Sequence, residues 1–448
     1  MPDQQPRQQL EAIYRAAIVA IQPDRAVRCG LDDASLNVDR PLQLLAIGKA
    51  AETMLASALS WCALNRITPV GGICISHSDV RAALPNIFDV ARGDHPQPGD
   101  GSFAAAELLR DYVARRVERG AQVVVLLSGG TSALIGAPAG ALTSDDYRDC
   151  CALLLRSGLD IHAHNALRRQ LSMWGNGRLG VALHHAGASV RVLAISDVPG
   201  DALESIGSAP CIMTPASPEE NDAIVDTAAL DVAERELLRG SLRIANVQHP
   251  AEFPACSHTV ISSNRIAREA VSVAATELKI QVVLMPQMLS GDAHACGESI
   301  ARELVSLRVI AHEPLLCCWG GEPTVTLPAH APPGGRMQAL ALAAAGTLHS
   351  LGDAAAGITL LAAGTDGRDG ATDAAGAVVD AQTWEAVRAA GGDPQALLDA
   401  HDSHSALRLS ESLIPEFMSG TNVNDLVIAL IRDPITPTAM PHHGLHCR

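Results

Sequence analysis

A glycine-rich turn in the first third of the chain has the residue types that bind phosphate. The stretch "LLSGGTSAL" (126–134) ends an apolar run and continues with five small residues: Ser128, Gly129, Gly130, Thr131 and Ser132. Two adjacent glycines allow backbone N–H groups to converge on an anion, and the hydroxyl groups add donors. The turn therefore predicts a phosphate-binding loop, with a tight turn that binds no ligand as the alternative. Its pattern matches neither G-x-G-x-x-G nor G-x-x-x-x-G-K-[ST].

A lysine occupies a comparable position earlier in the chain. In "LLAIGKAA" (44–51), Lys49 directly follows an apolar run and precedes a segment of helical pattern. Of the 33 basic residues, only Lys49 and Lys279 are lysines. A lysine there can donate to a phosphate group as a compact point charge. We expect Lys49 to be functional, with capping of nearby carbonyl groups as the alternative.

Two aspartates share one tight turn after another apolar run. "AISDVPGD" (194–201) contains Asp197 and Asp201. Such carboxylates can hold Mg²⁺ through one or two oxygens, and one of them can accept the proton of a substrate hydroxyl group. Hydrogen bonds that only close the turn are the alternative for both residues.

Two glycine-rich turns in the second half of the chain supply charged side chains. Glu322 lies in "CWGGEPTVTL" (318–327), and Arg336 lies in "PPGGRMQAL" (332–340). Arg336 suits bidentate binding of a carboxylate or phosphate group, with a surface arginine as the alternative. We expect Glu322 to assist binding of Mg²⁺ and nucleotide.

The stretch "AAGTDGRDGATDAAGA" (362–377) is unusually rich in aspartate and glycine. Its aspartates, Asp366, Asp369 and Asp373, do not match the spacing of an EF-hand calcium loop. The stretch ends a predicted strand and could cap the next element, and Asp366 is a candidate for the nucleotide site. Further on, "SGTNVNDL" (419–426) predicts the N-cap of a last helix. Both stretches could instead line a cleft.

These turns follow a series of short apolar runs that alternate with segments of helical period. Continuous apolar runs are typical of strands buried on both faces, as in a parallel sheet. Alternation of such strands with helices predicts an α/β fold, and 448 residues predict two domains. Eight runs are strand candidates: 42–50, 71–78, 121–133, 190–201, 258–264, 280–287, 315–324 and 357–367. The clearest helical segments are 102–119, 220–239, 264–278 and 293–307. Eight strands also allow a (β/α)₈ barrel, which their irregular spacing disfavours.

Composition and charge limit the class of partner. The net charge of −16 disfavours nucleic acid or an anionic membrane as the main partner, and no apolar run approaches the length of a membrane span. The 11 cysteines contain no CxxC pair, which indicates reduced thiols and a cytoplasmic protein. The histidines form no convincing ligand set with nearby carboxylates.

The turns together resemble those of one family. "AIGKAA", "GDHPQPG", "LLSGGTSAL", "NALRRQLS", "ISDVPGD", "GGEPTV", "AAGTDGRDGATDAAGA" and "GTNVNDL" occur in the order found in class II glycerate kinases, the MOFRL family. Some members of this family carry the name hydroxypyruvate reductase. The resemblance extends from about Ala46 to Leu430.

The resemblance implies a two-domain α/β enzyme of the cytoplasm, with its active site in the cleft between a Rossmann-like N-terminal domain and a C-terminal domain. It implies Mg²⁺-dependent transfer of the ATP γ-phosphoryl group to a hydroxyl group of D-glycerate, giving 2-phosphoglycerate. Lys49, Asp197 and Arg336 match the family's catalytic residues. The expected ranges are 1–245 and 255–441, followed by a tail at 442–448, and a homodimer is left open.

The chain departs from the family pattern in several turns. "RRQLSMWGNGRL" has Gly175 and Asn176 where the family usually has Lys-Gly, and "GGRMQA" has Met337 and Ala339 where the family has polar residues. We expect these turns to face the ligand, so that Met337 and Ala339 make the pocket less polar. Three alternatives to a glycerate kinase therefore stay open. They are a kinase for another small hydroxy acid, a catalytically impaired paralogue that still binds ligands, and an NAD(P)-dependent reductase. The missing dinucleotide fingerprint disfavours the reductase.

Overall fold

The computed structural model describes residues 4–79, 84–214, 216–245, 256–328 and 331–432. The chain divides into two compact units. We call residues 20–265 and 420–423 the N-terminal unit, and residues 1–19, 266–419 and 424–448 the C-terminal unit. The predicted tail at 442–448 and most of the expected domain junction lie outside the described residues.

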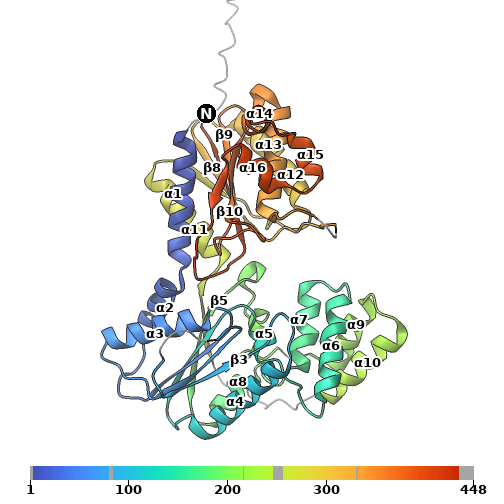
Figure 1. Cartoon of the computed structure of the whole chain (residues 1–448). Helices are drawn as coiled ribbons and strands as arrows, with labels where there is room; N and C mark the ends of the chain where they lie inside the picture. Colours follow the sequence, from blue (N-terminus) through green and yellow to red (C-terminus); the bar gives the residue numbers. More distant parts are fainter. Residues whose placement is uncertain (1–3, 80–83, 215, 246–255, 329–330, 433–448) are drawn as a thin grey trace, which may run out of the picture. The chain divides into compact units, whose positions relative to one another are not determined.

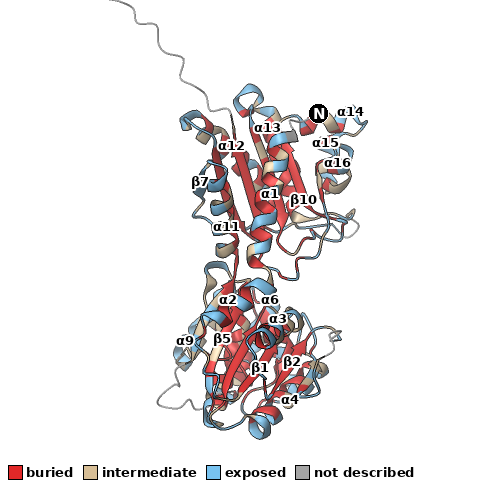
Figure 2. Cartoon of the chain, turned by 90° about the vertical axis from the view of Figure 1, so that its left-hand side faces the viewer, coloured by how far each residue is buried: buried red, intermediate tan, exposed pale blue. Residues whose placement is uncertain are grey.

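In the described part of the N-terminal unit, six strands form one fully parallel sheet (Figure 1). The strand order is β3-β2-β1-β4-β5-β6. The bounds are β1 Leu42–Ile47, β2 Gly71–Ser76, β3 Phe88–Arg92, β4 Gln122–Leu127, β5 Ser189–Ile195 and β6 Ser257–Ser262. Every residue of β1, β2 and β4 is buried, as their continuous apolar sequences predict (Figure 2).

Helices cover both faces of this sheet. On one face, α4 (Asp100–Arg116) and α8 (Arg178–His185) share a hydrophobic core with β1, β2, β4 and β5. On the other face lie α2 (Pro23–Asp32) and α3 (Ala51–Leu64), which pack against each other. This three-layer arrangement gives the strands apolar neighbours on both sides, so that only their ends are free to carry polar groups.

A second group of helices extends from the sheet of the N-terminal unit (Figure 1). It has its own apolar core, built around Tyr147, Leu154 and Leu238. Its members are α6 (Ser144–Arg156), α7 (Ile161–Leu171), α9 (Pro218–Thr227) and α10 (Val232–Ile244). The short elements α5 (Thr131–Leu134), η1 (Pro199–Asp201) and η2 (Ile206–Ser208) connect this group to the strand ends.

The C-terminal unit contains a mixed sheet of six described strands in the order β11-β10-β9-β12-β8-β7. Only β7 and β8 pair in parallel, and the other neighbouring strands are antiparallel. The bounds are β7 Gln281–Leu284, β8 Leu315–Gly321, β9 Ile358–Gly364, β10 Ala374–Asp380, β11 Leu413–Pro415 and β12 Asp425–Ile431.

Helices also cover both faces of this second sheet (Figures 1 and 2). On one face, α12 (Ala293–Ile310) and α13 (Arg336–Ser350) form a core with alternate residues of β8, β9, β10 and β12. On the other face lie α1 (Gln4–Ile21) and α11 (Asn264–Glu277). Four short elements complete the unit: η3 (Gly352–Ala355), α14 (Thr383–Ala389), α15 (Pro394–Asp399) and α16 (Ser403–Leu409).

The predicted α/β class and its arrangement as two sheet-centred units are confirmed, and the barrel is excluded because the strands form two open sheets. All eight predicted strand regions contain a strand. The predicted helix at 220–239 is two helices, because α9 ends at Thr227 and α10 begins at Val232.

Two expectations were wrong. Continuous apolar runs in the second half indicated parallel strands, yet most pairs there are antiparallel. Helices on both faces bury such strands regardless of direction, so burial alone does not fix direction. The predicted last helix is instead β12, a central strand. Its short apolar run "LVIALI" contains three β-branched residues and suits a strand.

The units also differ from the expected domain ranges 1–245 and 255–441. Strand β6 pairs in parallel with β5 and therefore belongs to the N-terminal unit. Residues 1–19 group with the C-terminal unit instead. Within that unit the Tyr14 hydroxyl group donates a hydrogen bond to the carbonyl of Gly364, at the end of β9.

Candidate active site

The predicted phosphate-binding turn lies at the point where the strand order of the N-terminal sheet reverses. The chain proceeds outward from β1 to β2 and β3, then returns to β4 on the opposite side of β1. Ligands of open parallel sheets bind outside the carboxyl ends of the strands at such a point. Lys49 follows β1, and the turn Ser128–Ser132 follows β4.

Hydroxyl groups fasten this turn to the end of β1. Ser128 Oγ accepts a hydrogen bond from the backbone N–H of Ala50 at 3.0 Å, at the start of α3. Thr131 Oγ1 lies 3.0 Å from the carbonyl oxygen of Ile47 and 2.8 Å from that of Ser128. Ser128 and Thr131 therefore hold the turn in place, rather than offering free hydroxyl groups to a ligand as the sequence indicated.

The backbone amides of the turn remain available. Within the described residues, no hydrogen bond from the N–H groups of Gly129, Gly130, Thr131 or Ser132 to another part of the chain is found. Gly130 has a φ of 85° and precedes the single helical turn α5. A left-handed residue beside right-handed ones directs successive N–H groups toward one point, a geometry that binds anions. This geometry supports the predicted phosphate cradle.

Lys49 lies against this turn. A Cβ added at Gly130 would be 3.1 Å from Lys49 Cγ and 3.1 Å from His95 Cδ2, so both side chains contact the turn. The Lys49 N–H also donates to the Gly129 carbonyl at 2.9 Å. Burial, with smaller contributions from Lys49 and His77, lowers the pKa of His95.

His77 and His95 were not among the residues predicted from the sequence. His77 follows β2 and His95 follows β3, so both occupy the same kind of position as Lys49. The signal was present in "ISHS", which spans the end of β2, and in "GDHPQPG", which directly follows β3. The second stretch contributed to the family resemblance without suggesting a role for His95.

Asp197 reaches the turn from the end of β5. A Cβ added at Gly129 would lie 2.3 Å from Asp197 Oδ2, so only a glycine permits this approach. Asp197 also raises the pKa of Arg168, against the larger effect of burial, which lowers it. Lys49 and Asp197 thus both contact the glycine turn, from the ends of β1 and β5.

Asp201 has different neighbours. Its carboxylate accepts a hydrogen bond from Ser263 Oγ at 2.8 Å, and Arg265 Nε lies 3.4 Å from the same oxygen. Over the described ranges, no group of three or more His, Cys, Asp and Glu side chains could by itself hold a metal ion. Among the described residues, no third side chain of these types joins Asp197 and Asp201 to complete the predicted metal site.

A second cluster of predicted residues lies in the C-terminal unit. Arg336 is the first residue of α13, and Asp425 is the first residue of β12. Arg336 Nε lies 2.6 Å from Asp425 Oδ2, and Nη2 lies 3.2 Å from Oδ1, which makes a bidentate pair. Arg336 Nη1 lies 3.1 Å from Glu322 Oε1. All three nitrogens of the guanidinium therefore face carboxylates.

The two carboxylates differ in their exposure. The Asp425 side chain is 4% exposed, whereas that of Glu322 is 49% exposed. Burial raises the pKa of Asp425 to about 7, although Arg336 acts in the opposite direction. Burial lowers the pKa of Arg336, but Asp425 and Glu322 outweigh that effect and raise it. The stretch 419–426 predicted a helix cap or a cleft lining, and neither prediction indicated the pairing of Asp425 with Arg336.

The aspartate-rich stretch is the loop of the hairpin formed by β9 and β10. Buried Asp369 accepts hydrogen bonds from the backbone N–H groups of Met337 at 3.2 Å and Gln338 at 2.8 Å. It therefore caps α13 from outside the helix. This cap fixes where the helix starts, and so the position of its first residue, Arg336. Asp366 accepts from the Arg368 N–H at 3.0 Å within the loop. A ligand contact by Asp366 stays a prediction.

The departures from the family pattern lie in packed positions. Met337 and Ala339 are buried in the core between α13 and the sheet, at 0% and 4% exposure. Asn176 Nδ2 donates to Gln170 Oε1 at 3.2 Å, and its Oδ1 accepts from the Thr214 N–H at 2.8 Å. The expectation that Met337 and Ala339 make a ligand pocket less polar is therefore wrong.

Comparison with known proteins places these features in a family. A model of a domain of unknown function, DUF4147, matches residues 9–239, and the MOFRL family model matches residues 315–425. The D-glycerate 2-kinase of Thermotoga maritima is 31% identical over 422 residues, which cover 94% of this chain and 97% of that protein. An Agrobacterium vitis protein, provisionally named a hydroxypyruvate reductase, is 32% identical over 433 residues, or 95% of this chain and 94% of that protein.

A solved structure gives the same result. The crystal structure of the Thermotoga maritima glycerate kinase has a TM-score of 0.83 and 28% sequence identity, and the match covers 95% of this chain and 99% of that one. Because the match covers 95% of this chain, it extends over both units. The chain belongs to the MOFRL family of glycerate 2-kinases.

Proposed function

We propose that this chain transfers the γ-phosphoryl group of ATP to a hydroxyl group of D-glycerate and forms 2-phosphoglycerate. The observation that carries the proposal is the convergence of Lys49, the amides of Gly129–Ser132 and Asp197 at the carboxyl end of the N-terminal sheet. A cation and amides for phosphate, with a carboxylate for a hydroxyl proton, are the groups that phosphoryl transfer requires.

Each residue has a separate role in this mechanism. The substrate hydroxyl oxygen bonds to the γ-phosphorus of ATP, the bond from phosphorus to the ADP oxygen breaks, and Asp197 accepts the hydroxyl proton. The Gly129–Ser132 amides bind phosphate oxygens, and Lys49 neutralises charge on the transferring group. We also propose that Arg336 binds an anionic group, either the transferring phosphoryl group or the substrate carboxylate. An anion reaching it would compete with the exposed partner Glu322, while buried Asp425 holds the other edge of the guanidinium.

The residues present fit a magnesium ion that arrives with ATP. Mg²⁺ is commonly held by one or two protein carboxylates together with substrate phosphates, so it needs no complete cage of protein ligands. Asp197 can offer such an oxygen, whereas Asp201 is engaged with Ser263 and Arg265. Glu322 and Asp366 are weaker candidates in the C-terminal unit. When bound, Mg²⁺ supplies charge neutralisation of the phosphates.

Three alternatives have less support. A kinase for another hydroxy acid was favoured by the expectation of a less polar pocket at Met337 and Ala339. Both residues lie in the core, so they do not support that alternative. A reductase would need a dinucleotide site, yet the turn after β1 carries Gly48 and Lys49 in place of the glycine fingerprint. The retained contacts of Lys49 and Asp197 with the glycine turn also argue against a paralogue that only binds ligands.

The decisive experiment measures ADP release from Mg·ATP with D-glycerate, with a panel of other hydroxy acids in parallel. NADH oxidation with hydroxypyruvate is followed in separate reactions. Glycerate-dependent ADP release without NADH oxidation is the expected result. NADH oxidation without ADP release would establish the reductase, and ADP release with a different acid would establish another substrate.

Location and assembly belong to the same proposal. The helices within the described ranges are too short or too polar to cross a lipid bilayer. The described cysteines are all free thiols, which supports the predicted cytoplasmic location. A homodimer stays a prediction that light scattering of the purified chain tests.

A further inference from the structure

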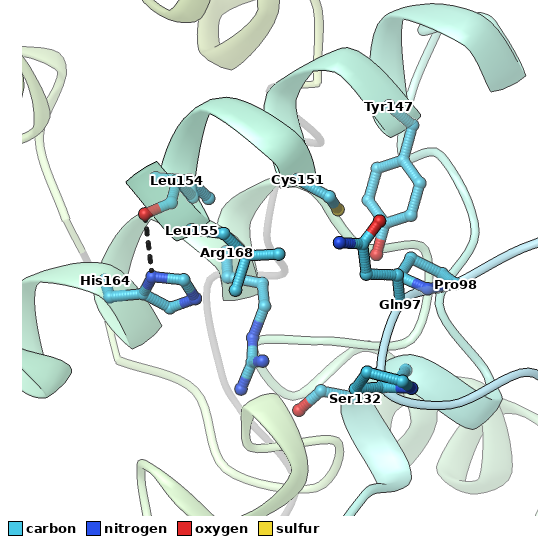
Figure 3. A pocket seen from close by; sticks show the side chains of 11 residues that line it. Gln97, Pro98, Ser132, Tyr147, Cys151, Leu154, Leu155, His164 and Arg168 are labelled. Carbon is cyan, nitrogen blue, oxygen red and sulfur yellow. Dashed lines mark hydrogen bonds between the residues drawn. The ribbon is translucent and has the colours of Figure 1, made fainter. Parts of the chain in front are cut away.

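A small pocket of the N-terminal unit lies beside the candidate active site (Figure 3). It encloses about 350 Å³, including space open to solvent. Helices α6 and α7 form one side of it, and Ser132 of the glycine turn and the segment Pro96–Pro98 form the other. The space inside it that a water-sized molecule can occupy is about 30 Å³, which suits a single small group at one end of a ligand.

Arg168 supplies the permanent charge among the described residues that line this pocket. Its side chain extends from α7 toward Ser132 (Figure 3). The other lining residues include Leu154, Leu155 and Pro98, so the charge lies in largely apolar surroundings. A buried charge in such surroundings is costly unless it is paired.

The contacts of Arg168 leave part of its guanidinium without a partner. Nη2 donates to Asn165 Oδ1 at 2.8 Å, which is a neutral amide oxygen. Nε is buried and has no hydrogen-bond partner in the described part of the chain. Burial lowers the pKa of Arg168, and Tyr147, Cys151 and Asp197 oppose that effect only in part. An anionic ligand in the pocket would compensate the charge of this guanidinium.

The neighbouring Ser132 can also donate a hydrogen bond to such a ligand. Ser132 Oγ accepts a hydrogen bond from Ser208 Oγ at 2.8 Å. Since Ser208 is the donor, the proton of the Ser132 hydroxyl group remains available to an acceptor in the pocket. Arg168 and Ser132 can thus donate to one oxyanion from two sides.

The position of Asp197 indicates which oxyanion this is. In a 2-hydroxy acid, the hydroxyl group and the carboxylate are attached to the same carbon atom. The group that binds the carboxylate must therefore lie close to the group that accepts the hydroxyl proton. Asp197 contacts the glycine turn that contains Ser132, and it acts electrostatically on Arg168.

We propose that Arg168, assisted by Ser132, binds the carboxylate of the hydroxy acid substrate. This assignment rests on the proposed kinase function. It makes Arg168 the residue that distinguishes a hydroxy acid from an uncharged alcohol. The guanidinium fork suits a planar carboxylate better than a lysine would.

The test compares D-glycerate with its neutral amide, glyceramide, in the wild type and in Arg168→Gln and Arg168→Lys. The wild type is expected to favour glycerate. Arg168→Gln is expected to raise KM for glycerate about 10- to 100-fold, the effect of losing a charged hydrogen bond, and to leave KM for ATP unchanged. It should also reduce the preference for glycerate over glyceramide. Arg168→Lys should recover part of that preference.

The control is Arg156→Gln, which removes an arginine from α6 in the same helical group. Arg156 is 58% exposed and pairs with Glu234 on the surface, so its loss should leave both KM values unchanged. Thermal unfolding checks that each variant is folded. If Arg168→Gln does not fold, Ser132→Ala and Arg168→Lys provide the same comparison of the two ligands.

Three results would overturn the assignment. The first is that Arg168→Gln raises KM for ATP alone, which would assign a nucleotide phosphate to the pocket. The second is that Arg168→Gln leaves the preference for glycerate unchanged. The third is that Arg156→Gln has an equal effect. Calorimetric binding of glycerate and glyceramide without ATP separates this assignment from the proposed function. A wild type that binds glycerate through Arg168 but releases no ADP would contradict the kinase and retain the carboxylate site.

Discussion

Asp425, the first residue of β12, holds Arg336, the first residue of α13, through two hydrogen bonds of 2.6 and 3.2 Å. The two residues are 89 positions apart in sequence, and each begins its element. The start of a helix and the start of a central strand are thus joined by one ion pair. Because the Asp425 side chain is almost fully buried, this pair behaves differently from the ion pairs on the protein surface.

The stability of the C-terminal unit should depend on pH through Asp425. Burial raises the pKa of Asp425 to about 7, above the ordinary value of 3.8 that applies to an unfolded chain. The folded state therefore holds this proton more tightly, and the resulting stabilisation is complete below about pH 4 and lost as the pH rises through 7. The wild type should lose more stability between pH 5 and pH 8 than Asp425→Asn does.

Urea unfolding at several pH values measures this difference. Glu416→Gln serves as the control, because Glu416 is exposed after β11 and pairs with Arg368. It should retain the wild-type slope. An identical pH slope in the wild type and in Asp425→Asn would contradict the assignment of this titration to Asp425.

The two partners of Arg336 should contribute unequally to stability. Asp425→Ala removes a buried partner and leaves a partly buried guanidinium without it, a change that typically costs about 3–5 kcal/mol. Glu322→Ala removes an exposed partner, and exposed ion pairs are typically worth about 0–1 kcal/mol. The free energies of unfolding of the two variants should therefore differ by several-fold, and equal losses would contradict the difference in burial.

The catalytic role of Lys49 can be tested against the other lysine of the chain. Lys49→Ala should lower kcat about 10²- to 10³-fold, by analogy with removal of one donor that stabilises charge in a transition state. Lys279→Ala should leave kcat unchanged, because Lys279 is exposed and follows α11 at the surface. ADP release is the measurement, and Lys49→Ala turning over within about threefold of the wild type would remove Lys49 from the mechanism.

Local sequence patterns predicted the parts of the site that depend on strand ends. Lys49, the glycine turn and Asp197 each follow an apolar run, and parallel strands bring such positions to one edge. The partners of Arg336 could not be predicted in this way. Asp425 and Asp369 reach α13 from distant parts of the chain, and only the order of the strands determines that approach.

The direction in which side chains point could also not be predicted from the sequence. Met337 and Ala339 closely follow the charged Arg336 of a glycine-rich turn, which indicated a ligand-facing position. In the structure α13 begins at Arg336, so its next residues already follow the helical period and point into the core. The exact start of a helix depends on its cap, and here the capping carboxylate comes from Asp369.

Loss of that cap should therefore affect both stability and Arg336. Asp369→Ala removes the acceptor of two backbone N–H groups at the start of α13, which typically costs about 0.5–2 kcal/mol. Because Arg336 begins this helix, kcat should also fall, while KM for ATP changes little. Asp369→Asn keeps one acceptor oxygen and should recover part of kcat, and a loss of stability without any change in kcat would mean that the cap does not position Arg336.

The glycine that replaces the family's usual lysine at position 175 should not accept a side chain. A Cβ added at Gly175 would lie 2.6 Å from the carbonyl oxygen of Arg169 and 3.1 Å from its Cα. These are backbone atoms of α7, so Gly175→Lys must shift the turn or the helix, and overpacking of this kind typically costs about 1–3 kcal/mol. Gly240→Lys is the matched control, because a Cβ at Gly240 in α10 meets no atom within 4 Å. That control should unfold at the wild-type temperature or above it, since glycine weakens a helix. The measurement is the midpoint of thermal unfolding of both variants. Equal midpoints would show that the turn around Gly175 adapts, and that the usual lysine could be restored there without loss of stability.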